Sequence, residues 1–387
     1  MGSLDFRKLA RQYESELVDR VIPWWMDHAV DFKDGGMLYD LRLDGTVLSG
    51  EKSMWSQARA LYTWSALYNR VGNRYEWLDL ADHIYTFVLG IGRDSRWEWP
   101  EAVHKDGRIK EGPGRIYADG FAIMGMTEYA TATGEDDAVD AALKTYDALQ
   151  ERMDEPGPHL DVPPELLPTA KCHGISMIFS MVFHELGRYL NNPEIMQAGY
   201  DHALQILDEF RRPDREVLLE YIGTDGKELD APQGRLVRPG HAIESMWFLL
   251  HIFGDRRERS RADQAVECLR WHLEKGWDAR YGGMFQTLDA DGKPTEPDAE
   301  KCLWPHNEAL VALLMAYEHS REPWCLEWFD KVHQWTFAHF RVPECGEWRE
   351  KVQRDGRAPA EAERVHTAFH LPRSLMLCLE SLERLSK

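Results

Sequence analysis

The stretch DGGMLYDLRLDG, residues 34–45, decides the fold because the chain repeats it. Residues 281–292 read YGGMFQTLDADG, so both segments contain a Gly-Gly-Met motif, a short alternating run and an Asp-Gly pair. An Asp-Gly pair between alternating residues is a strong signal for a hairpin turn. Both segments are followed by the pattern K-x-x-W-x-x-x-[R/E]-A-L, at Lys52 and at Lys301. An internal repeat of this kind predicts an architecture of repeated units.

Asp-Gly pairs continue this series along the chain. They begin at five positions: Asp44, Asp106, Asp225, Asp291 and Asp355. The spacings are 62, 119, 66 and 64 residues, and the turn-rich segment 154–168 fills the gap in the longest one. We therefore predict six units of roughly 60–65 residues, each with a helix, a hairpin or turn-rich excursion, and a second helix.

The expected helices fall into two kinds. Residues 174–186 and 308–318 are apolar on nearly all sides, whereas residues 194–212 are amphipathic. A helix that is apolar all round must be surrounded by other elements. A closed ring satisfies this requirement better than an open solenoid. The sequence thus predicts an all-α fold, an (α/α)6 barrel in which residues 1–387 form one domain and short β-hairpins cover one end.

Composition limits the partners and the compartment. The net charge of −20 argues against binding nucleic acid or an anionic membrane surface. No apolar run approaches the roughly 18 residues of a membrane span, and residues 1–25 read as an amphipathic helix and not as a secretion signal. The six cysteines include no CxxC pair. This favours free buried thiols in a reducing, cytoplasmic compartment.

The first turns of the six inner helices are expected to meet at one end of the barrel, because each inner helix follows its hairpin. Polar, titratable and aromatic residues occupy these positions: Arg59, Tyr117, Asp119, His173, His241, Glu244, Trp304, His306, Glu308, His370 and Arg373. Titratable groups that converge in a pocket are the default hypothesis for an active site. The pattern therefore predicts a small-molecule site at the barrel mouth.

Four segments in order resemble the N-acylglucosamine 2-epimerase family: residues 51–69, 234–250, 303–318 and 369–378. The similarity covers almost the whole chain. The family also contains cellobiose 2-epimerases, mannose 2-epimerases and aldose–ketose isomerases. Its fold is an (α/α)6 barrel, which agrees with the prediction from the repeats.

The resemblance implies roles for individual residues by matched position. It implies catalytic roles for four residues: His241, His370, Arg59 and Glu244. It also implies that Glu308 and Trp304 bind the sugar, and the expected position at the mouth adds three binding candidates: Tyr117, Asp119 and His173. In addition, it implies a homodimer and a nucleotide effector, since dimers are common in the family and the N-acylglucosamine branch responds to nucleotides.

The chemistry of a 2-epimerase fits these residue types. Inverting a sugar at C2 requires opening the ring and removing a proton beside the aldehyde, which gives a cis-enediolate. Two acid/base groups that titrate near neutral pH are needed, one on each face, and His241 and His370 fit. The guanidinium of Arg59 suits the enediolate oxygen, and Glu244 could orient His241 or bind a hydroxyl. This scheme requires no metal or nicotinamide.

Several alternatives stay open. N-acyl-D-glucosamine/N-acyl-D-mannosamine interconversion is the first choice, and a D-mannose 2-epimerase or a mannose–fructose type isomerase is close behind. Residues 350–366 lack the Trp of the disaccharide-acting branch, which weakens the cellobiose reading. A glycoside hydrolase would use paired carboxylates such as Asp119, Glu244 and Glu308. A non-catalytic binding protein is a third class.

Three of the site residues also have other interpretations. Arg59 could be a structural ion-pair partner of Glu244 or Glu308. His241 and Glu244 form an H-x-x-E pair on one helical turn, which could supply two metal ligands. No HExxH or CxxC motif accompanies the pair, so the sequence predicts no metal site.

Overall fold

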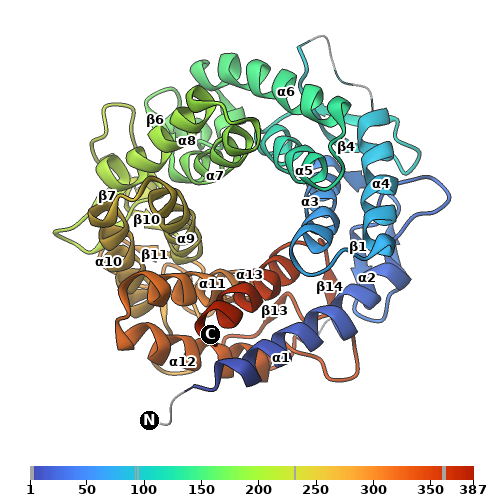
Figure 1. Cartoon of the computed structure of the whole chain (residues 1–387). Coiled ribbons are helices and arrows are strands. Elements are labelled where there is room, and N and C mark those ends of the chain that lie inside the picture. Colours follow the sequence, from blue (N-terminus) through green and yellow to red (C-terminus); the bar gives the residue numbers. More distant parts are fainter. Residues whose placement is uncertain (1–3, 92, 94–95, 231, 360–362) are drawn as a thin grey trace.

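The computed structural model describes residues 4–91, 93, 96–230, 232–359 and 363–387, and its helices form two concentric rings (Figure 1). The inner ring contains α3 (Met54–Arg70), α5 (Tyr117–Thr133), α7 (His173–Leu190), α9 (Pro239–Arg256), α11 (Leu303–Ser320) and α13 (His370–Leu385). The outer ring contains α4 (Tyr75–Gly90), α6 (Asp136–Asp154), α8 (Pro193–Gln205), α10 (Arg259–Gly276) and α12 (Pro323–His339). The run α1 (Phe6–Glu16), η1 (Leu17–Val21) and α2 (Ile22–His28) completes it. The predicted (α/α)6 barrel is confirmed.

The two rings follow from the two kinds of helix in the sequence. Inner helices such as α7 and α11 bury almost every residue of their first three turns, because neighbours cover them on all sides. Outer helices such as α6 bury one stripe and leave the other face in solvent. Each inner helix contacts the next around the ring, and α13 contacts α3, so the ring is closed.

Short antiparallel strands lie before the inner helices. The pairings are β14 (Arg364–Val365) with β1 (Asp40–Arg42) and β2 (Val47–Ser49); β3 (Lys52–Ser53) with β4 (Pro100–Val103) and β5 (Ile109–Pro113); β6 (Ala170–Cys172) with β9 (Tyr221–Gly223); β7 (Arg211–Arg212) with β8 (Val217–Leu218); β10 (Leu236–Val237) with β11 (Leu288–Asp289); and β12 (Lys301–Cys302) with β13 (Lys351–Val352). Leu41 of β1 pairs with Val365 of β14, which joins the first and last units. The hairpins therefore cover the N-terminal ends of the inner helices, as predicted.

Segment 154–168 fills its repeat slot in a different way from the others. It forms two short 3-10 turns, η2 (Pro158–Leu160) and η3 (Pro164–Leu166), and no hairpin. The five Asp-Gly turns each place glycine at a positive φ, for example +84° at Gly45 and +78° at Gly292. Glycine adopts this conformation without steric cost, which explains why the other five slots can use tight turns.

The repeated lysine, Lys52 or Lys301, forms hydrogen bonds that hold each Gly-Gly-Met loop in place. Lys301 is buried, and its Nζ donates to the Asp278 carboxylate at 3.2 Å and to the Gly282 carbonyl. Lys52 makes the same contact with Asp31, at 2.8 Å. Burial lowers the pKa of Lys301 to about 8, although Asp278 opposes this shift. The repeat seen in the sequence is thus a buried ion pair that fixes a loop above an inner helix.

Replacing this lysine is expected to destabilise the barrel. Lys301→Met leaves the buried Asp278 with Arg354 as its remaining ion-pair partner, and breaking a buried pair costs about 3–5 kcal/mol. Urea unfolding followed by circular dichroism measures this loss. The matched control is Lys293→Met at an exposed position, which should stay within about 0.5 kcal/mol of the parent. Equal stability of the two variants would show that the pair does not hold the loop.

Two further expectations can be compared with the structure. None of the helices in the described part of the chain is long and apolar enough to cross a membrane. All six cysteines are free thiols, and all but Cys345 are buried. The expectation of free buried thiols is therefore confirmed, with Cys345 half-buried.

Candidate active site

Two histidines flank one tryptophan at the mouth of the barrel. His241, Trp304 and His370 occupy the first turns of α9, α11 and α13. The Trp304 ring centroid lies 5.6 Å from that of His241 and 5.6 Å from that of His370. The side chains of His241 and His370 are 22% and 18% exposed, so both imidazoles reach solvent. A side chain at Gly240 would collide with Trp304, which explains the glycine before His241.

A buried carboxylate stands behind His241. The Nδ1 atom of His241 lies 3.0 Å from Oε1 of Glu220, which immediately precedes β9. Burial by itself would lower the pKa of His241, but the Glu220 carboxylate outweighs this effect and the pKa is raised. Burial would likewise raise the pKa of Glu220, yet His241 and His173 hold it well below its usual value. The pair therefore favours an imidazolium beside a carboxylate.

A second buried carboxylate stands behind His370. Its Nδ1 lies 2.7 Å from Oε1 of Glu308, whose other oxygen accepts a hydrogen bond from the Trp247 indole at 2.8 Å. Burial lowers the pKa of His370 well below its usual value, and the positive charge of Arg59 lowers it further. This shift favours a neutral imidazole at His370, whereas the shift at His241 favours imidazolium.

Arg373, and not Arg59, forms the ion pairs of the site. Its guanidinium donates to Glu308 at 2.8 Å and also to Glu244. Glu244 and Glu308 are the two carboxylates that the sequence offers as structural ion-pair partners for Arg59. Glu244 contacts Arg373 instead of His241 through its side chain, so the structure gives it the role of fixing a guanidinium between α9, α11 and α13.

Arg59 is held by aromatic faces. Its guanidinium carbon lies 3.7 Å from the Trp55 ring centroid, 4.1 Å from that of Phe121 and 4.3 Å from that of Phe369. Its Nε is buried without a hydrogen-bond partner in the described residues. Burial lowers the pKa of Arg59 well below its usual value, while Glu244 opposes the shift, yet guanidinium stays protonated in proteins. A cation in this position has donors to offer a ligand.

The remaining predicted residues lie at different depths. Buried His173 forms a hydrogen bond with the Ser245 hydroxyl at 2.8 Å. Its Nδ1 lies 3.7 Å from Glu220, so His173 packs against the carboxylate that contacts His241. Tyr117 contacts Asp161 at 3.3 Å near the same pair. The Asp119 side chain does not contact this pair.

Asp119 contacts the outer ring. Its carboxylate accepts a hydrogen bond from the Trp99 backbone N–H at 2.9 Å and another from the Arg152 guanidinium of α6 at 2.5 Å. Burial raises its pKa to about 7, although Arg152 opposes the shift. These partners join α5 to α6, so the Asp119 carboxylate is engaged in the structure and, contrary to the expectation, does not line the site. His306 is similarly engaged, accepting from the Met284 backbone at 2.9 Å.

Sequence reasoning missed Glu220 and Trp247. Glu220 interrupts the apolar run 217–222, and a single acid within a buried strand is a signal that could have found it. Trp247 gives no such signal, because it lies among other apolar residues of its helix. Only the packing of α9 against α11 brings its indole to Glu308.

Two groups at the mouth offer enough donor atoms for a metal: His173, Glu220 and His241; and Glu244, Glu308 and His370. In the second group the Arg373 guanidinium already contacts both carboxylates and supplies the positive charge. The predicted H-x-x-E pair does not form a common ligand set, since His241 and Glu244 fall in different groups. The arrangement suits proton transfer by imidazoles beside an organic ligand.

The chain belongs to the N-acylglucosamine 2-epimerase family, whose family model matches residues 35–372, and the protein is therefore an isomerase that acts on carbohydrates. The N-acylglucosamine 2-epimerase of Bos taurus is 33% identical and aligns with 95% of this chain and 90% of its own.

Solved structures share the barrel. A cellobiose 2-epimerase from Bacillus thermoamylovorans superposes with a TM-score of 0.85 at 19% identity, covering 98% of this chain and 100% of that chain. A D-mannose isomerase gives a TM-score of 0.82 at 16% identity, covering 99% and 100%. At these identities the likeness shows the fold alone.

Removing the charge of Glu220 should lower the pKa of His241. Glu220→Gln keeps the shape of the side chain but withdraws the carboxylate that favours imidazolium. NMR titration of the His241 ring protons measures the pKa directly and does not depend on activity. Glu165→Gln, an exposed glutamate in a nearby loop, is the control and should leave His241 unchanged. A His241 pKa that is the same in Glu220→Gln would refute the pairing.

Proposed function

We propose that the protein is a cofactor-independent 2-epimerase of open-chain reducing sugars that interconverts N-acyl-D-glucosamine and N-acyl-D-mannosamine. The observation that carries this proposal is the pair of histidines on either side of Trp304, each backed by its own buried carboxylate. A 2-epimerase needs two such groups, because the proton leaves one face of C2 and returns to the other.

The two carboxylates support a division of labour between the imidazoles. Hydrogen bonds at Nδ1 leave the Nε2 atoms of His241 and His370 for the substrate. In one direction, neutral His370 removes the C2 proton, and the C–H electron pair enters the enediolate. His241 imidazolium then returns a proton to the opposite face of C2. The reverse reaction exchanges the two roles, and water restores both protonation states.

Arg59 supports the charged intermediate. Deprotonation at C2 places negative charge on the enediolate oxygen, and a fixed cation in a water-poor site stabilises that charge strongly. The N-terminal ends of the surrounding inner helices add partial positive charge at the same level. Trp304 offers an aromatic face for the sugar, while Glu244 and Glu308 fix Arg373 and His370 in place.

The N-acyl sugar is the preferred substrate because relatives that share a third of their residues with this chain carry that name. A panel of free sugars followed by NMR tests the choice. Epimerisation of N-acetylmannosamine faster than of mannose supports it. Faster turnover of mannose, or a ketose product, would identify the mannose 2-epimerase or mannose–fructose isomerase instead.

We place the enzyme in the cytoplasm because its six free thiols suit a reducing compartment. A nucleotide effector and a homodimer stay predictions from the family resemblance. Thermal shift with added ATP and sedimentation of the purified chain are the corresponding measurements.

Each histidine should be essential for turnover. His241→Asn and His370→Asn keep polarity and approximate size but cannot transfer a proton, and general acid–base groups contribute on the order of 10²–10⁴-fold. The rate of epimerisation by NMR should fall by this factor in each variant while the melting temperature is kept. His319→Asn, on the outer side of α11, is the control. Near-normal turnover in either site variant would refute the assignment.

Arg59 should not tolerate lysine. Arg59→Lys retains the charge, but an ammonium cannot copy the planar fork or its stacking against three aromatic rings. The value of kcat should fall at least roughly tenfold, as expected for loss of oxyanion stabilisation. An unchanged kcat together with lower stability would indicate a purely structural arginine.

A further inference from the structure

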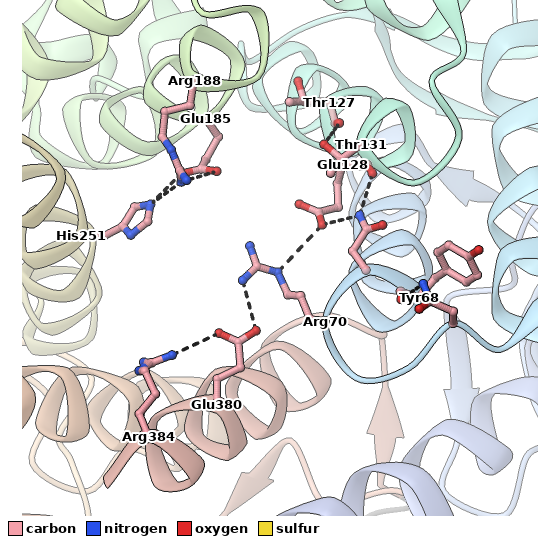
Figure 2. Close-up of polar contacts among 12 residues, drawn as sticks. Tyr68, Arg70, Thr127, Glu128, Thr131, Glu185, Arg188, His251, Glu380 and Arg384 are labelled. Carbon is pink, nitrogen blue, oxygen red and sulfur yellow. Dashed lines mark hydrogen bonds and ion pairs between the residues drawn. The ribbon is translucent and has the colours of Figure 1, made fainter. Parts of the chain in front are cut away.

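The opposite ends of the inner helices carry a second cluster of titratable groups. Figure 2 shows Glu185 and Arg188 of α7 and His251 of α9 pointing toward one another. His251 lies ten residues beyond His241 along α9, which is about 15 Å at the helical rise of 1.5 Å per residue. The cluster is therefore separate from the mouth of the barrel and has no part in the proposed proton transfer.

Donor atoms of three side chains in this cluster lie close together, and Glu185 contacts one of them. Nε2 of His184 is 3.0 Å from Oδ2 of Asp255, and Nε2 of His251 is 2.7 Å from Oε1 of Glu185. The donor atoms of His184, His251 and Asp255 all lie within 4.8 Å of one another. In a tetrahedral zinc site with bonds of about 2.0–2.2 Å, ligand atoms are roughly 3.3–3.6 Å apart. Small movements of these three side chains would bring their donor atoms to this spacing, and Glu185 lies beside them through its contact with His251.

A guanidinium already takes the cation's position among these atoms. Arg188 lies 3.1 Å from Glu185, 3.3 Å from Asp255 and 3.2 Å from Nε2 of His251. Its side chain is 43% exposed on a flexible stem, so it can move aside. The two carboxylates at this place, Glu185 and Asp255, carry a charge of −2. Arg188 balances half of that charge, and a divalent ion balances all of it.

We propose that His184, His251 and Asp255 bind one zinc ion beside Glu185, with Arg188 as the internal competitor that the metal displaces. The ligands come from neighbouring inner helices, so the ion clamps α7 to α9 near their C-terminal ends. These ends carry partial negative charge, which favours a cation.

The combination of imidazole nitrogen and carboxylate oxygen ligands favours some metal ions over others. Two imidazoles favour Zn²⁺, Co²⁺ or Ni²⁺, whereas Mg²⁺ and Ca²⁺ prefer sites made of oxygen atoms. Co²⁺ is a useful probe, since its visible absorption reports a tetrahedral nitrogen and oxygen site.

Calorimetric titration of the chelator-treated full chain with ZnCl₂, together with Co²⁺ absorption, tests this site. We expect one zinc per chain and a higher melting temperature with the metal. His251→Ala and Asp255→Asn should each weaken binding at least tenfold. Arg188→Gln should tighten binding several-fold, because it removes the competitor. Arg256→Gln, a nearby arginine outside the cluster, should leave binding unchanged.

A further variant separates this site from the active site. His241→Asn disrupts the donor group at the mouth and should leave zinc binding as it is. Absence of zinc binding would overturn the proposal. So would binding that survives both His251→Ala and Asp255→Asn, binding lost in His241→Asn, or weaker binding in Arg188→Gln. None of these readouts uses epimerase activity, so the result stands apart from the proposed function.

Discussion

The site depends on one carboxylate, Glu308, which has no exposed surface and joins three inner helices. It accepts hydrogen bonds from Trp247 of α9 and from His370 and Arg373 of α13. Burying an ionised carboxylate costs several kcal/mol unless charge and hydrogen bonds compensate it. Here the guanidinium and two ring N–H groups do so. The same contacts that make the burial tolerable hold His370 in one tautomer.

The two histidines differ because their surroundings differ. Glu220 lies 3.0 Å from His241 and also forms an ion pair with Arg238 at 3.8 Å, and the net effect on His241 is a raised pKa. Glu308 is shared with Arg373, and burial together with the nearby Arg59 lowers the pKa of His370. Groups whose environments push their pKa values apart can serve as acid and base at one pH. The asymmetry thus arises from the balance of burial and neighbouring charges around each imidazole, and not from the histidines themselves.

The same separation of roles explains the two arginines. Arg373 carries the structural ion pairs with Glu244 and Glu308. Arg59 is left stacked among Trp55 and Phe369 with a buried Nε unpaired in the described residues. A guanidinium with an N–H group that is unpaired in the described residues can donate that hydrogen bond to an anionic intermediate.

The barrel could be predicted from the sequence because its repeats recur at fixed spacing and its inner helices are apolar on all sides. The His241 and His370 positions followed from the same pattern, since both begin inner helices. The acid Glu220 stands out in its apolar run, but its partner could not be predicted, because the contact with His241 depends on the β6–β9 pairing. Asp119 begins an inner helix too, but its side chain turns to Arg152, a direction that helix position alone does not fix.

In the proposed mechanism two bases act on opposite faces of the sugar, and this determines which hydrogen is found at C2 of the product. Both imidazoles exchange protons with water between turnovers, so the proton returned is not the proton removed. Conversion of N-acetylmannosamine in D₂O, followed by proton NMR, measures this. The two-histidine mechanism predicts close to one deuterium at C2 of each 2-epimer molecule and no ketose. A product that keeps its original C2 hydrogen would contradict it.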